Sequence, residues 1–254
     1  RFLVSPTTGH THIDIKALDA RKIRLVSLAG ERSFLRNIKA TPEHTLGLIL
    51  AVLRNYRKAF ISENNPNWDR DLCRGDEIAG AKVGLIGYGR VGQILGRYLT
   101  AMEAEIYWFD PAPTTEHSEG IACENLMSLI DKVDIVVMCA SHTPGSPPIL
   151  DSTHLALLKG KYFVNTSRGE LVDETFLIKM LEAKELAGAA LDVIAGEQTT
   201  ADRRRWEAIA SANPEVIITP HIAGATWRSM KLTEEFAAEK LINLINQQTE
   251  SYSQ

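Results

Sequence analysis

The sequence predicts an α/β protein whose main part is an open, doubly wound parallel sheet, accompanied by a second, smaller domain. From residue 82 onward, short β-rich runs alternate with helical patterns. Some of these runs, such as Ile135–Met138, are apolar nearly throughout, which is typical of strands that helices bury on both faces. The chain has 254 residues, of which 44% are hydrophobic and 24% charged, so it can form a packed core of this kind.

The first part of the chain predicts a little β structure and one clear helix. Phe2–Ser5 and Ile23–Leu28 are β-rich runs with a short helical stretch between them. Thr41–Glu43 indicates a helix start, with Thr41 as the N-cap, proline in the first turn and an acid beside it. The helix then continues through apolar positions at helical spacing: Leu46, Ile49, Leu50, Leu53 and Tyr56. Ser62–Trp68 breaks the pattern and predicts a loop or arm.

The remaining elements follow in regular alternation. The expected strands are Val83–Ile86, Glu105–Phe109, Asp134–Cys139, Tyr162–Asn165, Ala189–Val193 and Val216–Ile218. The expected helices are Val91–Met102, Glu124–Asp131, Thr153–Leu158, Glu174–Ala183 and Arg203–Ser211. A last helix is expected from Thr226 to Ile245, with Met230, Phe236, Leu241 and Leu244 in the core.

Composition excludes several classes of protein. With 28 basic and 32 acidic side chains the net charge is −4, which argues against a general nucleic-acid binder. The longest apolar runs, such as Leu48–Leu53, are far shorter than the roughly 20 residues that a spanning helix needs. The three cysteines, Cys73, Cys123 and Cys139, form no C-x-x-C pair, which indicates reduced thiols and a cytoplasmic protein.

A glycine-rich loop at residues 87–92 carries the clearest motif. Gly87, Gly89 and Gly92 match G-x-G-x-x-G, a weak signal by itself. Here the loop follows the apolar strand Val83–Ile86 and opens a helix, and Asp110 ends the next strand 18 residues after Gly92. The first glycine allows a tight turn, the second a close approach to a pyrophosphate, and the third helix packing. The context predicts a dinucleotide site, with phosphates at the helix N-terminus.

Asp110 indicates which dinucleotide is bound. A carboxylate at this position accepts hydrogen bonds from the adenosine ribose and repels the extra phosphate of NADP. The segment that follows, Pro111-Ala112-Pro113, supplies no arginine to bind such a phosphate. The sequence therefore favours NAD over NADP, the alternative being a tight turn followed by a solvated aspartate.

Three further polar segments come at predicted strand ends. Asn165–Glu174 contains Arg168, Leu191–Glu197 ends with Glu197, and Thr219–Thr226 contains His221. In an open α/β sheet the ligand crevice lies beyond the carboxyl ends of the strands. Arg168, Glu197 and His221 can therefore converge, although 53 positions separate the first from the last.

With these segments the chain closely resembles the D-isomer-specific 2-hydroxyacid dehydrogenase family, which includes phosphoglycerate, glycerate, D-lactate and formate dehydrogenases. The resemblance extends over nearly the whole chain and is carried by Thr7–Gly9 with Ile13-Asp14, Ala40–Thr45, Gly87–Gly92, Asn165–Glu174, Leu191–Glu197 and Pro220–Thr226. It implies a Rossmann NAD domain at residues 44–224. A flavodoxin-like substrate domain would comprise residues 1–43 and a returning helix at 225–254. Family members carry a further strand–helix portion before Phe2, so this domain is expected to be N-terminally truncated.

The resemblance also assigns roles to residues. Arg168 would bind the substrate carboxylate, with the Thr8-Gly9 backbone as a second hold, and His221 would be the acid/base with Glu197 as its partner. The implied cofactor contacts are Gly87, Gly89, Arg90, Val91, Gly92, Asp110, Thr143, Thr166, Ser167, Asp192 and Gly224. It also implies a homodimer, with Ser62–Gly75 as a candidate contact arm.

The chemistry of these residue types agrees with the assignment. The planar guanidinium of arginine grips a carboxylate through two parallel hydrogen bonds, as lysine cannot. Oxidation of a hydroxy acid removes a hydroxyl proton as hydride leaves for the nicotinamide ring. Histidine suits this role because it titrates near neutral pH. A neighbouring carboxylate would fix the ring and favour its protonated form.

Each residue also has an ordinary structural interpretation. Taken alone, Arg168 would be a surface arginine, Glu197 a solvated charge and His221 a loop or core histidine. His10, His12 and His44 could suggest a metal site, but His44 falls in a helix start and no acidic ligand set accompanies them, so no metal is expected. Arg203–Arg205 predicts a solvated helix face, with phosphate binding as the alternative. His142 lies in the loop that resembles the family's cofactor side and is not expected to be catalytic.

The chain departs from the family pattern in two places. Gln198 follows Glu197 where the family has proline, so a looser turn is expected there. The chain begins at Arg1, already within a β-rich run, so a longer natural protein is expected. An NADH-sensing corepressor-like binding protein without significant turnover is the main alternative to a dehydrogenase, and an inert fragment is a third possibility.

Overall fold

The computed structural model describes residues 1–10, 12–60, 67–112 and 119–252, and the chain divides into two compact units. Unit 1 comprises Arg1–Ala40 and Gly224–Gln254, and unit 2 comprises Thr41–Ala223. The boundary expected after residue 43 falls inside a helix that begins at Ala40, whereas the boundary between the units lies at the start of that helix.

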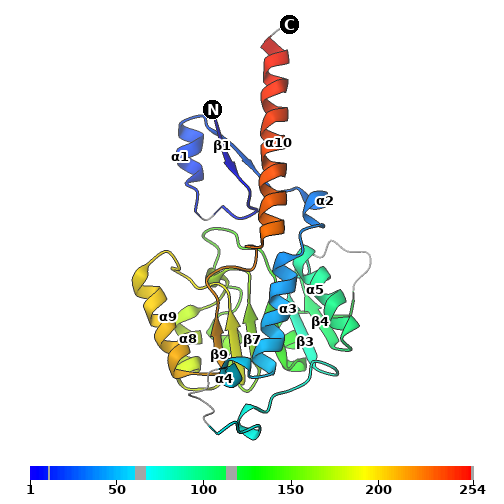
Figure 1. The fold of residues 1–254 in the computed structure, drawn as a ribbon, viewed down its shortest axis with the longest axis vertical. Helices are drawn as coiled ribbons and strands as arrows, with labels where there is room; N and C mark the ends of the chain where they lie inside the picture. The colour runs from blue at the N-terminus through cyan, green and yellow to red at the C-terminus, as the bar shows by residue number, and fades with distance from the viewer. Residues whose placement is uncertain (11, 61–66, 113–118, 253–254) are drawn as a thin grey trace. The chain divides into compact units, whose positions relative to one another are not determined.

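Unit 2 is built on a parallel sheet (Figure 1), which confirms the fold class predicted from the sequence. In the described residues it has seven strands in the order β5-β4-β3-β6-β7-β8-β9. Their bounds are β3 Lys82–Ile86, β4 Glu105–Phe109, β5 Ile121–Ala122, β6 Ile135–Met138, β7 Tyr162–Asn165, β8 Gly188–Leu191 and β9 Val216–Ile218. The chain runs outward from β3 to β5 and then returns to place β6 on the other side of β3. This reversal creates a topological switch point between β3 and β6.

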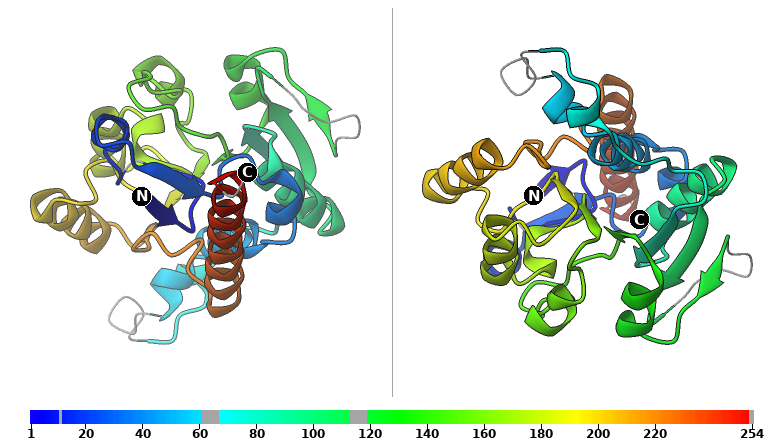
Figure 2. Two further views of the ribbon diagram at one scale, coloured as in Figure 1. Left: turned by 90° about the horizontal axis from the view of Figure 1, so that it is seen from above. Right: turned by 90° about the horizontal axis from the view of Figure 1, so that it is seen from below.

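Helices cover both faces of this sheet (Figure 2), as strands that are apolar on both sides require. Val83 and Leu85 of β3 face the core that contains α3, Ala40–Leu53, and α5, Arg90–Ala101. Ile86 faces the opposite core. That core is formed with α6 Leu126–Lys132, α7 Ser152–Ala156, α8 Glu174–Glu182 and α9 Thr200–Ala212. The alternation along each strand thus divides the apolar side chains between two cores.

The helix predicted from Thr41 to Tyr56 differs from the structure at both ends. It begins at Ala40, so Thr41 lies inside its first turn and is not the N-cap. It ends at Leu53, because Asn55 adopts a left-handed conformation (φ 53°) that stops the helix. Tyr56 instead begins a separate short helix, α4 Tyr56–Phe60. The helical spacing of apolar residues continues across the break, which is why the sequence did not reveal it.

Unit 1 contains a two-stranded parallel sheet, β1 Phe2–Ser5 and β2 Arg24–Ser27. Between these strands, α1 Ile15–Ala20 is capped by the Asp14 side chain, which accepts from the Ala17 amide at 2.9 Å. The short helix α2, Arg32–Leu35, follows β2. A small apolar core joins this part of the chain to α10, Trp227–Tyr252. It contains Leu28, which follows β2, Leu35 of α2, Ile38 and Ala237 of α10.

Helix α10 is fixed to the rest of unit 1 by two further contacts. The Phe34 and Phe236 rings stack with their centroids 4.0 Å apart, and Lys240 donates to the Ser27 carbonyl and to Glu31. Met230, predicted as a core position, is 47% exposed, so that prediction was wrong.

None of the helices in the described part of the chain combines the length and the apolar character of a membrane span.

The segment proposed as a contact arm, Ser62–Gly75, is described only in part, because residues 62–66 lie outside the described residues. The described portion includes the 3₁₀ helix η2, Asp71–Cys73, and Trp68, which is 94% exposed. An exposed tryptophan of this kind is compatible with a protein contact. The homodimer remains a prediction.

Candidate functional site

The glycine loop joins β3 to α5 in the way its sequence predicts, and each glycine has its own reason. Gly87 has φ +89°, and a Cβ there would lie 2.6 Å from the Cα and N of Ala140. Gly92 packs against the Gly87 carbonyl, so a side chain would separate the helix from the loop. A Cβ on Gly89, the N-cap of α5, would meet only open space. The loop therefore leaves room for a ligand at Gly89, before the unpaired amides of the helix N-terminus.

Asp110 is oriented by backbone donors on both sides. Its Oδ2 accepts from the Tyr88 amide at 2.8 Å, and its Oδ1 accepts from the Ala112 amide at 2.9 Å. The carboxylate is thus fixed beside the glycine loop, at the end of β4, where ribose hydroxyls of a dinucleotide would reach it. The open space at Gly89, the helix N-terminus and this carboxylate fit an NAD molecule.

Arg90 and Val91 form the first turn of α5 and are both half-buried. Burial lowers the pKa of the Arg90 guanidinium, which remains cationic at neutral pH. Tyr88, between the first two glycines, is buried and stacks on Trp108 with ring centroids 4.5 Å apart. Its hydroxyl donates to the Glu119 carbonyl and accepts from the Glu119 amide, so the loop is fixed to the segment that leads into β5.

The loop that follows β6 lies at the switch point, next to Gly87. Thr143 is exposed there, and its carbonyl accepts from the Ser146 amide and hydroxyl at 3.0 and 2.8 Å. Ser167, which follows β7, donates to the carbonyl of Met138, the last residue of β6, at 2.9 Å and so joins the ends of these two strands. Burial raises the pKa of the Cys139 thiol to about 12, which keeps the thiol protonated at neutral pH.

The carboxyl ends of β7, β8 and β9 are aligned. Asn165 pairs with Leu191 in the β7–β8 register, and Leu191 pairs with Ile218 in the β8–β9 register. Neighbouring strands lie about 4.8 Å apart, so the three segments that leave these ends start side by side. These are the segments that carry Arg168, Glu197 and His221.

The Arg168 segment is held by the buried side chain of Asn165. Its amide nitrogen donates to the Arg168 carbonyl at 2.9 Å, and its oxygen accepts from the Ser167 amide at 3.0 Å. Arg168 is extended and half-buried, and its Nη1 donates to the Ser167 carbonyl at 2.6 Å. Gly169 follows at the start of the 3₁₀ helix η3, Gly169–Leu171, where a Cβ would collide with the backbone of Ile194 and Ala195. The Arg168 segment is therefore in direct backbone contact with the segment that leads to Glu197.

The Glu197 turn is better defined than the sequence suggested. Gly196 has φ +68°, and its carbonyl accepts from the Thr199 amide at 2.8 Å, which closes a turn around Glu197 and Gln198. Thr199 then caps α9 by accepting from the Asp202 amide at 3.2 Å. Glutamine in place of proline thus leaves a turn that is closed by a backbone hydrogen bond.

Glu174 also stabilises the segment that leads into the Glu197 turn. Its carboxylate accepts from the Ala195 amide at 2.6 Å and from the Trp206 indole at 3.2 Å. Burial raises the pKa of Glu174, and these two donors partly oppose the effect by stabilising the charged form. Sequence patterns predict Glu174 only as the start of a helix, because its partners lie 21 and 32 positions away.

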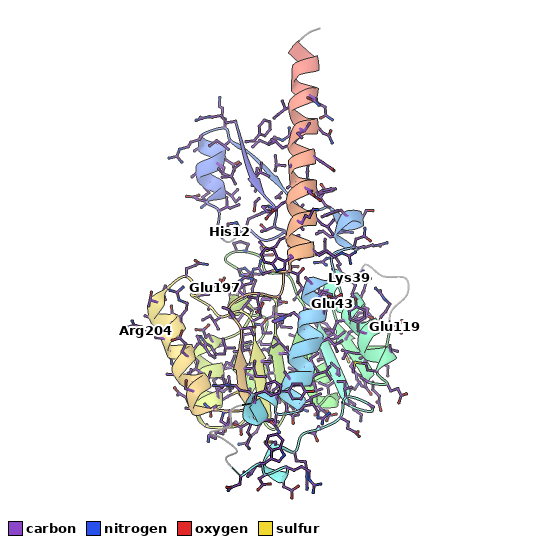
Figure 3. All side chains as sticks on the ribbon, viewed as in Figure 1. His12, Lys39, Glu43, Glu119, Glu197 and Arg204 are labelled. Carbon is purple, nitrogen blue, oxygen red and sulfur yellow. The ribbon has the colours of Figure 1, made fainter. Side chains whose placement is uncertain are left out.

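His221 and Glu197 meet directly. Nδ1 of His221 lies 2.8 Å from Oε1 and 3.0 Å from Oε2 of Glu197. Since a carboxylate only accepts, Nδ1 carries a hydrogen and Nε2 is left for a reacting group. The two side chains are 40% and 31% exposed, so they are open to a ligand. Figure 3 shows Glu197 at the end of the sheet where α9 begins.

Asp192, predicted as a cofactor contact, is 1% exposed and organises the turn that presents His221. Its Oδ1 accepts from the Thr219 hydroxyl at 2.6 Å and the Ile222 amide at 2.9 Å, and its Oδ2 accepts from the Ala223 amide at 2.8 Å. His221 itself is left-handed (φ 53°), a conformation that costs about 1–3 kcal/mol for residues other than glycine. The hydrogen bonds to Asp192 on both sides of His221 compensate this strain.

Helix α3 also contacts the carboxyl ends of these strands. The Thr45 hydroxyl donates to the Thr41 carbonyl and lies 2.7 Å from the buried Thr166 hydroxyl, so the two threonines join α3 to the end of β7. Nε2 of His44 lies 3.2 Å from the Thr219 hydroxyl and 3.4 Å from Oδ1 of Asp192. Sequence reasoning missed His44 and Thr219, since they are 175 positions apart. The cluster Thr219-Pro220-His221 at a strand end was the available signal for Thr219.

Thr8, Gly9 and Gly224 belong to unit 1, and their predicted contacts with substrate and cofactor remain predictions. The Thr7 hydroxyl donates to the Gly9 carbonyl at 2.9 Å, which bends the chain after β1. The Gly224 carbonyl accepts from the Ser229 hydroxyl at 2.7 Å, at the start of α10.

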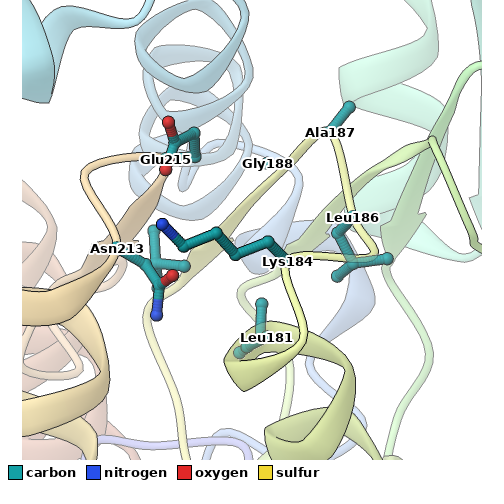
Figure 4. Close-up of a pocket in the computed structure, with 8 residues that line it drawn as sticks. Leu181, Lys184, Leu186, Ala187, Gly188, Asn213 and Glu215 are labelled. Carbon is teal, nitrogen blue, oxygen red and sulfur yellow. The ribbon is translucent and has the colours of Figure 1, made fainter.

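The remaining features are a possible metal site, an arginine run and a cavity. Among the residues that the structure describes, no three His, Cys, Asp or Glu side chains gather to hold a metal ion. Arg203–Arg205 lies on the exposed side of α9. A cavity of about 270 Å³ opens at the opposite, amino end of β8 and β9 (Figure 4), lined by Leu181, Lys184, Leu186, Ala187, Gly188, Asn213, Glu215 and Val216. It lies away from the crevice expected at the carboxyl ends of the strands.

Comparison with known proteins agrees with this geometry. Residues 46–223 match the family described as "D-isomer specific 2-hydroxyacid dehydrogenase, NAD binding domain". The chain is 30% identical to a Staphylococcus haemolyticus protein named "Putative 2-hydroxyacid dehydrogenase", over 99% of this chain and 78% of that one. It is 32% identical to D-3-phosphoglycerate dehydrogenase of Mycobacterium tuberculosis, over 86% of this chain but only 40% of that one.

Among solved structures, D-lactate dehydrogenase from Aquifex aeolicus, complexed with NAD and lactic acid, has the same fold. The TM-score is 0.85 at 21% identity, over 98% of this chain and 78% of the other. The family match extends over well over half of the chain and includes the glycine loop, Asp110 and the three aligned strand ends. The chain belongs to the D-isomer-specific 2-hydroxyacid dehydrogenase family, and unit 2 contains its NAD-binding domain.

Proposed function

We propose that the protein is an NAD-dependent dehydrogenase that oxidises a small D-2-hydroxy acid and reduces the matching 2-keto acid in reverse. The observation that carries the proposal is the hydrogen bond between His221 and Glu197, 2.8 Å long. This pair lies at the sheet edge that also holds the glycine loop and the Arg168 segment. The position of this pair, beside the Arg168 segment and open to a ligand, argues against a protein that only binds NADH.

Bound NAD supplies the hydride acceptor for oxidation, and the residues of the chain supply everything else. Nε2 of His221 takes the hydroxyl proton of the hydroxy acid and returns it to the keto acid in reverse. Glu197 holds the ring by Nδ1 and so fixes its orientation. The Arg168 guanidinium grips the substrate carboxylate and so fixes the reacting carbon near His221.

Cofactor choice follows from Asp110. The carboxylate is fixed by the Tyr88 and Ala112 amides, so it cannot turn aside for a 2′-phosphate. We expect NADH to bind more tightly than NADPH. The contacts proposed for Thr166, Asp192 and Gly224 would lie on the nicotinamide side, and Thr143 and Ser167 are further proposed cofactor contacts.

The decisive experiment measures NADH consumption by the full-length protein with a panel of 2-keto acids. We expect turnover with at least one of them. His221→Gln should lower kcat by about 10²–10⁴-fold, the usual contribution of a positioned acid/base, while the NADH dissociation constant from fluorescence titration stays unchanged.

A matched control is available in α7. Nδ1 of His154 contacts Oδ1 of Asp151 at 2.8 Å, so His154→Gln breaks a similar pair that has no part in the proposed mechanism. It should leave kcat within about twofold. Tight NADH binding with no turnover on any keto acid would favour the corepressor-like alternative, and equal kcat for the wild type and His221→Gln would remove His221 from the mechanism.

A further inference from the structure

The buried carboxylate of Asp192 has an imidazole as its nearest ionisable neighbour. Within the described residues, the one ion-pair partner of Asp192 is His44, whose Nε2 lies 3.4 Å from Oδ1. The imidazole is 22% exposed and comes from α3, an element that the proposed catalytic mechanism does not otherwise use. Thr45, the next residue, contacts Thr166. This turn of α3 is thus attached to the ends of β7 and β9 through consecutive side chains.

The hydrogen-bond directions in this group are determined by chemistry. The Asp192 carboxylate only accepts, so the Thr219 hydroxyl donates its single hydrogen to Oδ1 of Asp192, at 2.6 Å. The Thr219 oxygen can then only accept from His44, at 3.2 Å. It follows that Nε2 of His44 carries a hydrogen, which points at the Thr219 oxygen with the Asp192 carboxylate beside it.

The same carboxylate controls the His221 turn. Its oxygens accept from the Ile222 and Ala223 amides, which directly follow His221, while the Asp192 carbonyl accepts from the His221 amide at 2.9 Å. A movement of the Asp192 side chain would therefore release the left-handed backbone at His221. A catalytic group displaced by about 1 Å can lose about 10²-fold in rate.

We propose that His44 is a positioning residue for His221. Its Nε2–H fixes the Thr219–Asp192 pair, and through that pair it holds the turn that aims the imidazole. The proposal rests on the function proposed above for His221, but the coupling between His44 and the turn can be measured without any activity.

The test compares His44→Leu, which removes the donor, with His44→Gln, whose amide nitrogen lies as many bonds from Cβ as Nε2 does. Glu43→Gln, at an exposed neighbouring position of α3 (Figure 3), is the matched control. Hydrogen–deuterium exchange of residues 219–223 is measured on the full-length protein without cofactor or substrate. The NADH dissociation constant, kcat and KM for the keto acid, and the unfolding midpoint are measured alongside.

We expect His44→Leu to speed exchange at Ile222 and Ala223 and to lower kcat by about tenfold or more, with a smaller change in KM and in NADH affinity. His44→Gln should restore most of both, and Glu43→Gln should change neither. Unchanged exchange in His44→Leu, or a His44→Gln variant no better than His44→Leu, would overturn the proposal. A protein with no turnover on any keto acid would refute the proposed function, while the exchange data would still decide whether His44 holds the turn.

Discussion

Arg168 shows how a single side chain is prepared for its role by its neighbours. Asn165 fixes the backbone on both sides of it, and the extended conformation carries the side chain beyond the strand end. The next residue, Gly169, has no side chain, so the segment can pack directly against the backbone of Ile194 and Ala195. Both the identity of Arg168 and the shape of its segment therefore matter for a carboxylate ligand.

Replacement of Arg168 by lysine tests the two-bond grip. Lysine keeps the charge but cannot make two parallel hydrogen bonds, so we expect kcat/KM for the keto acid to fall by about 10–100-fold, mainly through KM. NADH affinity should not change. Arg204→Lys, on the exposed side of α9 (Figure 3), is the control and should leave both values as they are. A KM unaffected by Arg168→Lys would show that the substrate carboxylate binds elsewhere.

At the scale of elements, the glycines of the loop meet two separate demands, one from the fold and one from the ligand. Gly92 is required by the fold, because a side chain would strike the Gly87 carbonyl, whereas Gly89 faces open space. The first demand exists with or without the cofactor. The second arises only when a pyrophosphate approaches the helix N-terminus.

Alanine at each position should separate these demands. Gly89→Ala should leave the unfolding midpoint within a degree or two and weaken NADH binding by about tenfold or more, since 1.4 kcal/mol corresponds to a factor of ten. Gly92→Ala should lower both the midpoint and the affinity. Thermal unfolding and fluorescence titration of the two variants decide the matter. Full NADH affinity in Gly89→Ala would mean that the phosphates do not approach that residue.

The elements that were predicted correctly are those that local sequence determines. Six strands of unit 2 were found because their apolar runs and flanking turns are strong signals, but β5 was missed, since it has two residues and both are exposed. The Thr41 cap was wrong because the helix begins one residue earlier.

Local sequence likewise predicted the main residues of the candidate site but not the contacts that hold them. Strand ends and motifs identified Arg168, Glu197 and His221, and the structure places the last two in contact. The contacts of Asp192 with the 219–223 turn, and the role of His44, depend on pairs of residues far apart in the sequence, which no local pattern reveals.

At the scale of the whole of unit 2, the amino end of β7 is attached to the segment before β3. The Tyr162 hydroxyl donates to Oδ2 of Asp76 at 2.8 Å, across 86 positions of sequence. Burial, together with the hydrogen bond to and the charge of Asp76, raises the pKa of Tyr162 to about 12. The folded state therefore holds this proton at pH values where the unfolded chain, with an ordinary tyrosine pKa of about 10, has released it.

The stability of the protein should reflect this contact at alkaline pH. The contribution of Tyr162 is complete below pH 10 and is lost as the pH rises from about 10 through 12, because the unfolded state then releases its proton first. Tyr162→Phe should be less stable than the wild type at pH 8, with a difference that narrows towards pH 12 in urea titrations. Tyr107→Phe, whose hydroxyl lies 3.5 Å from Glu105 at the surface, is the control. A difference independent of pH would contradict the raised pKa.

The in-register pairing of β3, β6, β7, β8 and β9 sets the distance between the two ends of the proposed site. The cofactor phosphates are expected at the β3 end of it and His221 follows the β9 end, so their separation is counted in strand spacings of about 4.8 Å that backbone hydrogen bonds fix. Side chains along the strands can then change in volume without altering this separation between the phosphate site and His221. Selection on stability and selection on catalysis can therefore act on different residues of the same sheet.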